Sequence, residues 1–389
     1  MPDATESRCS LLRPLCSVLA RASAAAALLL VGCSGHAAGP WDPPAAAHYL
    51  DTRATAWLDW NKAARDHGTV CMSCHTSLPY LLARGDLRRV LHEPQVPEAE
   101  RRLLDMVRLR AQLWPHVRPW YGFEQTAGAL GTEPVVNALI LTHEDAGQGA
   151  LSPLTRKTLD DMWAQQRAQG PDAGSWPWIQ FNNEPWEAPD SVYYGATLAA
   201  LAVGFTPESY RRDPAVQAKM ALMRGYLRRA YDSQTLLNRI SLLWASAALP
   251  DLIEPVTRAA ILDSLTAEQR SDGGWNLASL MPGWKRRDAS PLPGQSDGFS
   301  TAYITLVLQQ SGVPRTDARL ARGLAWLEGH QSSWDGRWMT ESPNRSNGWL
   351  PHEGNHFMDD AATAFAVLSL IRAQAGDAVA RTVTALPAR

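Results

Sequence analysis

Cysteine is scarce in this chain, and its spacing limits what the fold can rely on. Five cysteines occur among 389 residues, at positions 9, 16, 33, 71 and 74, and only the last two lie close together. A four-cysteine zinc site would need a second Cys-x-x-Cys pair, which the sequence does not contain. A fold held by several disulfides is also excluded, because too few cysteines remain to form them.

An excess of charge of one sign is missing as well. The formal net charge is −2, and no basic patch or basic tail is present, so we expect no nucleic-acid partner. Alternation of polar and apolar residues with a period of two is also absent over any useful length. The sequence therefore argues against a β architecture.

The only long apolar run lies near the N-terminus. Residues 22–31 (ASAAAALLLV) follow three arginines and are too few to span a bilayer, so they are typical of the apolar region of a signal peptide. The run ends in Leu30-Val31-Gly32-Cys33, which resembles the lipobox of bacterial lipoproteins. The resemblance implies a signal peptide over residues 1–32, cleavage before Cys33 and acylation of the Cys33 sulfur.

Ordinary cleavage a few residues later, near Ala37-Ala38, is the alternative. The lipobox interpretation is favoured because it gives Cys33 a role at the end of the apolar region. Cys9 and Cys16 would leave with the signal peptide. We therefore expect an exported protein that faces the periplasm and is anchored to a membrane by lipid.

The most informative segment is Cys71-Met72-Ser73-Cys74-His75. Two cysteines separated by two residues and followed at once by histidine form the attachment signature of a c-type haem. Each thiol adds to one vinyl group of the porphyrin, and the next residue then lies beneath the iron as its proximal ligand. The alternatives are a thioredoxin-type redox pair or half of a zinc site. We predict one covalent haem c, attached through Cys71 and Cys74 and bound by His75.

The rest of the chain is predicted to be all-α and repetitive. Helices with small residues on one side and aliphatic residues on the other alternate with more amphipathic helices that carry charges on one face. The first kind is expected to begin near Gly131, Asp190, Leu237, Gly298 and Asp359. The second kind is expected to begin near Pro97, Ser152, Pro214, Pro255 and Asp317. Residues 49–64 and 78–91 make a sixth such pair at the start. A pair of this kind buries its apolar face only by stacking on its neighbours.

Three loops resemble a repeat found in squalene-hopene cyclases and their prenyltransferase relatives. Gln269 to Trp275 (QRSDGGW) fits the Gln-x-x-Asp-Gly-x-Trp repeat, residues 331–338 (QSSWDGRW) fit with one insertion, and residues 166–176 (QRAQGPDAGSW) are a stretched copy. The resemblance covers roughly residues 95–375 and implies an (α/α)6 toroid, in which these loops tether the ends of outer helices. With its haem motif, the chain is similar to cytochrome-like proteins that join such a motif to these repeats.

This organisation divides the chain into five parts. Residues 1–32 are the signal peptide, 33–45 a linker, 46–95 the haem-attaching first helix pair, 96–376 the cyclase-like repeats and 377–389 a C-terminal tail. In the first pair, the haem motif occupies the position that a Gln/Trp loop has elsewhere. The haem is therefore expected at the end of the ring where these loops emerge, near the mouth of the central cavity. The loops there carry Trp176, Trp178, Trp186, Trp284 and Trp349 with Glu184 and Glu187, which could wall a haem and a substrate or shield the porphyrin edges from water.

Closure of the ring places the last unit beside the first. The loop at 348–358 is then expected next to the haem, which makes His352, His356 and Met358 candidates for the sixth iron ligand, with His352 the leading one. His116, in the second unit, is a candidate from the other flank. The alternative for each is an ordinary loop residue.

Two functions fit these features. One is electron transfer between the haem and a redox partner protein. The other is a haem-dependent oxidase or peroxidase that acts on an apolar or aromatic small molecule in the toroid cavity. This second function would explain why the chain far exceeds the length needed to wrap one haem. The sequence alone does not decide whether the protein is an enzyme.

Terpene cyclisation ranks lower. The cyclase family protonates its substrate with an Asp-x-Asp-Asp stretch, and the nearest match here is Phe357-Met358-Asp359-Asp360, with Phe in place of the first Asp. Asp359 and Asp360 are expected to cap the helix that follows.

Overall fold

A computed structural model describes residues 41–114, 116, 117, 122–146, 148–344 and 356–384, with side chains omitted for 122–124 and 376–384. In these ranges the regular structure is helical throughout, with fourteen α-helices and two 3-10 turns and no β-strand. The prediction of an all-α chain is confirmed.

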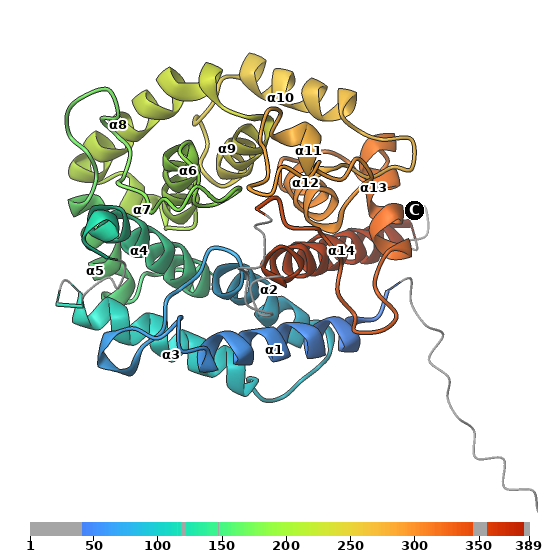
Figure 1. Ribbon diagram of the computed structural model, residues 1–389, viewed down its shortest axis with the longest axis horizontal. Helices are drawn as coiled ribbons and strands as arrows, with labels where there is room; N and C mark the ends of the chain where they lie inside the picture. Colours follow the sequence, from blue (N-terminus) through green and yellow to red (C-terminus); the bar gives the residue numbers. More distant parts are fainter. Residues whose placement is uncertain (1–40, 115, 118–121, 147, 345–355, 385–389) are drawn as a thin grey trace, which may run out of the picture. The chain divides into compact units, whose positions relative to one another are not determined.

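Six of the helices form an outer set and six an inner set (Figure 1). The outer helices are α1 (Pro43–Asp59), α3 (Glu98–Leu113), α5 (Pro153–Ala164), α8 (Pro214–Ala230), α10 (Pro255–Ala267) and α13 (Ala318–Gly329). The inner helices are α2 (Ser77–Val90), α4 (Gly122–Asp145), α6 (Ser191–Gly204), α9 (Leu236–Ala248), α12 (Gly298–Gln310) and α14 (Phe357–Thr384). Short pieces complete the described set: α7 (Glu208–Arg211), α11 (Leu277–Leu280) and the 3-10 turns at Asp66–Gly68 and Tyr231–Ser233.

Burial separates the two sets of helices. On the outer helix α3, the apolar residues that are buried form one stripe of Leu103, Leu104, Val107 and Ala111. The inner helix α6 is instead buried from Ser191 to Val203 on nearly every side, which its run of alanine, glycine and leucine permits. A helix that is apolar all round must be surrounded by other elements.

The inner helices contact one another in a closed order. Helix α2 packs on α4, α4 on α6, α6 on α9, α9 on α12, α12 on α14, and α14 returns to α2. The outer helix α1 also contacts α14 as well as its own partner α2. Helices of the last pair therefore contact helices of the first.

The three Gln/Trp loops use the same bonds. In each, the glutamine amide donates to a carbonyl of its own loop and to a carbonyl at the next outer helix, while the tryptophan indole donates back to the preceding outer helix. Gln166 reaches Lys219, Gln269 reaches Arg319, and Gln331 reaches Asp42, over 2.8–3.0 Å. Trp176, Trp275 and Trp338 donate to Met162, Leu265 and Leu327 and are fully buried. The loops thus join successive outer helices, and Gln331 joins the last to the first.

A glycine with positive φ sits in each of these loops. At Gly273 a β-carbon would lie 2.8 Å from the carbonyl oxygen of Arg322, and Gly174 and Gly336 face helix backbone in the same way, at Leu222 and Ala45. Left-handed φ and close approach of a helix together require glycine here.

Two helix starts differ from the sequence prediction. Helix α4 begins at Gly122 rather than near Gly131, because its glycines serve close packing rather than a turn: a β-carbon at Gly128 would lie 2.7 Å from the Trp178 carbonyl oxygen. Helix α1 begins at Pro43 and ends at Asp59, several residues before the predicted 49–64. Asp42 caps it by accepting from the Ala45 amide at 3.0 Å.

Gly336→Ala should destabilise the fold more than Gly312→Ala does. Both residues have φ near +80°, but Gly312 has open space around it, whereas a methyl group at Gly336 would press on the α1 backbone. We expect a loss of about 1–2 kcal/mol at Gly312 from the backbone conformation alone, and about 1–3 kcal/mol more at Gly336 from overpacking. Urea denaturation of both variants measures the difference. Equal losses would contradict the close approach of the last loop to α1.

Candidate functional site

The Cys-x-x-Cys-His segment lies between α1 and α2 and is fixed at both ends. The Cys71 amide donates to the Ala63 carbonyl at 2.8 Å, and the Trp57 indole of α1 donates to the Cys71 carbonyl at 2.7 Å. At the other end, the Ser73 hydroxyl accepts from the amides of Thr76 and Ser77 and so caps the start of α2. Hydrogen bonds therefore hold both ends of the motif in place.

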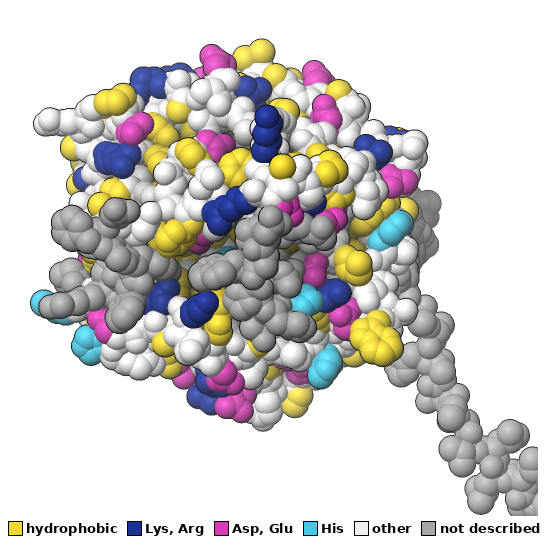
Figure 2. Space-filling view, in the orientation of Figure 1, with side chains coloured by type: hydrophobic (Ala, Val, Ile, Leu, Met, Phe, Trp, Pro, Cys, Tyr) yellow, Lys and Arg dark blue, Asp and Glu magenta, His cyan; other side chains and the backbone are white. Residues whose placement is uncertain are grey.

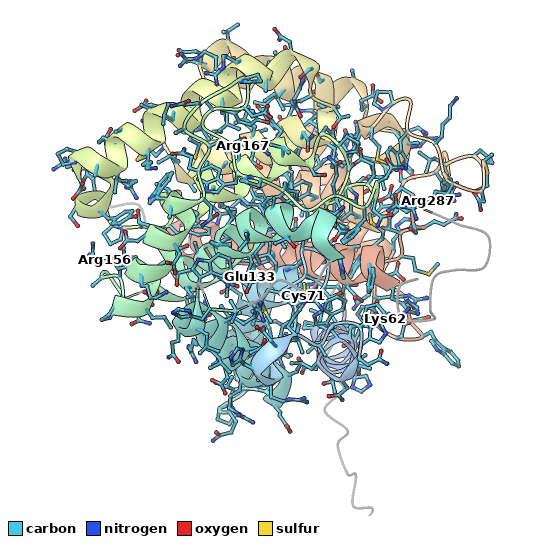
Figure 3. The ribbon with its side chains drawn as sticks, turned by 60° about the vertical axis from the view of Figure 1, so that its left-hand side comes forward. Lys62, Cys71, Glu133, Arg156, Arg167 and Arg287 are labelled. Carbon is cyan, nitrogen blue, oxygen red and sulfur yellow. The ribbon has the colours of Figure 1, made fainter. Side chains whose placement is uncertain are left out.

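This segment forms one wall of an open cleft of about 220 Å³. Both cysteines and His75 border it, as do Trp57 of α1 and Trp60, the residue after that helix. The remaining lining side chains come from α4, from the loop before α6 and from the start of α14. They are Ala129, Thr132, Glu133, Ile179, Phe181, Glu187 and Phe357. Cys71, Glu133 and Lys62, which are labelled in Figure 3, all border this cleft.

His75 is buried and surrounded by rings. Phe357 stacks on the imidazole with ring centroids 3.8 Å apart, and Trp57 meets it edge-on at 5.0 Å. Burial, aided by the positive charge of Arg53, lowers the pKa of His75 to about 3. The imidazole is therefore neutral at physiological pH, which is the form that binds a metal. Phe357 is also the residue that replaces the first acid of the cyclase motif, and its role here is to pack on His75.

A buried carboxylate lies behind the histidine. The Nδ1 of His75 is 2.9 Å from the Thr76 hydroxyl, which donates to Asp360 Oδ2 at 2.7 Å. Asp360 also accepts from Tyr49 at 3.0 Å and from Arg53 Nε at 2.8 Å. Asp359 accepts from the Thr340 amide at 2.7 Å. Both acids lie in the first turn of α14, as expected, but these contacts tie α14 to other elements instead of capping it.

The two thiols differ in exposure. Cys71 is partly exposed and Cys74 is buried. Burial raises the pKa of the Cys74 thiol well above its usual value, with a further contribution from Glu187. Cys74 is therefore a neutral thiol, and the two are not joined by a disulfide.

Two carboxylates border the cleft, one paired with an arginine and the other hydrogen-bonded to an asparagine. Glu133 is paired with Arg110, which also donates to the Thr69 hydroxyl. Glu187 lies on the loop before α6, where Asn183 donates to it at 3.4 Å, and burial raises its pKa to about 7. Arg287 donates to the carbonyl of Phe181 at 2.6 Å and so holds this loop in place.

The predicted candidates for the sixth iron ligand have different surroundings. His352 lies outside the described residues. His356 Nδ1 is 3.0 Å from the Arg337 guanidinium and 3.2 Å from Asp359, and Met358 is buried at the start of α14. His116 is exposed after α3. Among the described residues that line the cleft, Lys62 is a further potential ligand that the sequence analysis did not single out.

Trp186, from the loops expected around the haem, does reach the site, with its ring centroid 5.8 Å from that of His75. Thr76, Asp360 and Arg53 were missed by the sequence analysis. The only local signal is that Thr76 follows His75, whereas Asp360 is 284 residues away from Thr76.

Aromatic side chains pack between the inner helices. Trp186, Phe299, Tyr303 and Phe365 meet there, with the Tyr303 and Phe365 rings 5.0 Å apart, and together they line a pocket of about 10 Å³. That is at the lower limit for a single water molecule.

Acidic and basic side chains are interspersed on the face shown in Figure 2.

Comparison with protein-family models gives no match to this chain, and comparison with curated proteins also gives none. Among the described residues, no three His, Cys, Asp or Glu side chains are grouped so that they could hold a metal ion by themselves. In the same part of the chain, no helix is both long enough and apolar enough to cross a membrane.

Glu184→Gln should remove a pH dependence of stability. Burial and the charge of Asp190 raise the pKa of Glu184 from 4.5 to about 8. Between these values the folded protein holds a proton that the unfolded chain releases, so this residue makes stability fall as the pH rises. The variant should therefore gain stability relative to wild type from pH 4.5 to pH 8 in urea denaturation.

The matched control is Glu208→Gln, at an exposed residue of α7 that is paired with Arg212. Its stability should follow the wild-type pH profile in this range. A stability difference between Glu184→Gln and wild type that does not change with pH would contradict the burial of Glu184.

Proposed function

We propose that the protein is an exported monohaem c-type cytochrome built on an (α/α)6 toroid, with its haem in the cleft beside Cys71, Cys74 and His75, and that it transfers electrons to or from a partner protein. The observation that carries the proposal is the position of His75. Its buried imidazole borders the same open cleft as Cys71 and Cys74, which are not joined by a disulfide. Such a group has the chemistry of a proximal haem ligand.

The assignment to an (α/α)6 toroid rests on two supports. The inner helices contact one another in a closed order, and Gln331 of the last unit donates to Asp42 before the first helix. Both are what six stacked helix pairs require.

The residues at the cleft fit the proposed group. Cys71 and Cys74 would carry the porphyrin through thioethers, and His75 would bind the iron from one side. Trp57, Phe357 and Ile179 supply apolar contact area, while Lys62 and Arg65 add positive charge that suits the porphyrin carboxylates. When bound, the haem supplies one-electron chemistry, and the protein sets its potential through ligand identity, hydrogen bonding and burial.

We propose electron transfer ahead of catalysis in the centre of the ring. An oxidase, a peroxidase or a terpene cyclase that uses the central cavity needs room for its substrate, and among the described residues the pocket lined by Trp186, Phe299, Tyr303 and Phe365 is only about 10 Å³. Carbon monoxide separates the functions experimentally. A six-coordinate haem whose spectrum does not change with CO supports electron transfer, whereas rapid CO binding supports a haem enzyme.

Covalent attachment of the haem is directly testable. Protein made together with a c-type maturation system should keep its haem through extraction with acidified acetone and through denaturing electrophoresis, because thioether bonds survive both. A Cys71→Ala, Cys74→Ala variant should lose all haem from the polypeptide band. In-gel haem staining and intact mass measure both results.

The matched control replaces the two cysteines of the predicted signal peptide. A Cys9→Ala, Cys16→Ala variant should keep its full haem content. Complete extraction of haem from the wild-type protein would show that no thioether forms and would refute the proposal.

We further propose that Cys33 carries a lipid anchor. Intact mass of the mature protein should show a diacyl or triacyl adduct on an N-terminal Cys33. Cys33→Ser should release the protein from membranes without changing its haem content. An unmodified N-terminus that begins after Ala37 would contradict the anchor.

A further inference from the structure

We infer that Thr76 and Asp360 are positioning residues that fix the tautomer of His75 and tune the electron affinity of the iron that it binds. The inference rests on the proposed haem function. It concerns residues of this chain that do not touch the haem themselves.

The tautomer follows from counting protons. The Thr76 hydroxyl has one proton, and it donates that proton to Asp360 Oδ2 over 2.7 Å. Its oxygen can then only accept from His75 Nδ1, 2.9 Å away, so Nδ1 must carry the proton of the neutral ring. Nε2 is left with a free lone pair. This is the tautomer that binds iron through Nε2, and the protein has it before the metal arrives.

Asp360 is held so that it accepts and does not donate. Its Oδ1 receives the Tyr49 hydroxyl and Arg53 Nε, and the second Arg53 nitrogen lies 3.4 Å from Oδ2. Burial raises the pKa of Asp360, whereas the charge of Arg53 and the hydrogen bonds from Arg53, Thr76 and Tyr49 act to lower it. The guanidinium is always charged and can only donate, so the carboxylate is the form that these bonds favour. The Asp360 side chain is 2% exposed, and therefore water does not compete for these bonds.

The consequence for the iron is electronic. A carboxylate that accepts a hydrogen bond from Thr76 polarises the hydroxyl, and the hydroxyl in turn polarises the Nδ1–H bond of His75. Such partners raise the basicity of the ligating nitrogen. A more basic imidazole stabilises ferric iron relative to ferrous iron, so the network should hold the midpoint potential down.

The network also couples the potential to the fold. Asp360 belongs to α14, Tyr49 and Arg53 to α1, and Thr76 immediately precedes α2. The proximal ligand is therefore oriented by the contact between the last helix pair and the first. Stacking of Phe357, in the same turn of α14 as Asp360, fixes the plane of the ring.

The test compares two substitutions at Thr76 in the haem-loaded protein. Thr76→Val keeps the shape but removes the hydroxyl, and it should raise the midpoint potential. At a fixed ambient potential, the ratio of oxidised to reduced protein should fall roughly two- to tenfold, the effect of losing one hydrogen bond. Thr76→Ser restores the hydroxyl and should return the ratio to near the wild-type value. Resonance Raman spectra should show a weaker iron–histidine bond in Thr76→Val alone.

Asp360→Asn gives a second, independent test through the midpoint potential. It keeps the size of the side chain and removes the charge, so the potential should rise as in Thr76→Val. If wild-type protein carries no covalent haem, the proposed function fails and the inference falls with it. If the haem is present but Thr76→Val and Asp360→Asn both keep the wild-type potential and iron–histidine frequency, the inference alone is overturned.

Discussion

The contact between Asp360 and the first helix pair is the constraint on which the rest of the arrangement depends. One buried carboxylate accepts hydrogen bonds from Tyr49, Arg53 and Thr76, which come from α1 and from the residue before α2. A buried charge is costly unless it is paired and hydrogen-bonded, and here each oxygen has at least two donors. The bonds that close the chain of helix pairs are therefore the same bonds that orient His75.

The Gln/Trp loops join successive outer helices, just as Asp360 joins the inner helix α14 to the first helix pair. Each glutamine amide connects its own loop to the next outer helix, and the copy at Gln331 spans 289 residues to reach Asp42. The first helix pair has no such glutamine and carries the Cys-x-x-Cys-His segment at that position instead. The loop position that a Gln/Trp loop occupies in three other units therefore carries the Cys-x-x-Cys-His segment in the first unit. Residues of α1, α4 and α14 line the cleft beside this segment.

Local signals predicted the helices well, and long-range packing explains the misses. Ser152 and Asp213 cap α5 and α8 through bonds to nearby amides, so their positions could be seen in a short stretch of sequence. The start of α4 could not be predicted in this way, because glycine at position 128 is required by the close approach of Trp178, some 50 residues later. The thiols and His75 are evident from their motif. The Asp360 network is not, because nothing in an Asp-Asp pair at a helix start indicates which side chains from the first unit will meet it.

The central claim is that a haem iron sits in this cleft on His75. Crystals of protein made with a c-type maturation system, measured on both sides of the iron absorption edge, test it most directly through the anomalous difference map. The account predicts a single iron peak within coordination distance of His75 Nε2, with the Thr76 hydroxyl on the opposite side of the imidazole ring. An iron bound elsewhere, or no iron in a cleft whose thiols remain unmodified, would contradict it.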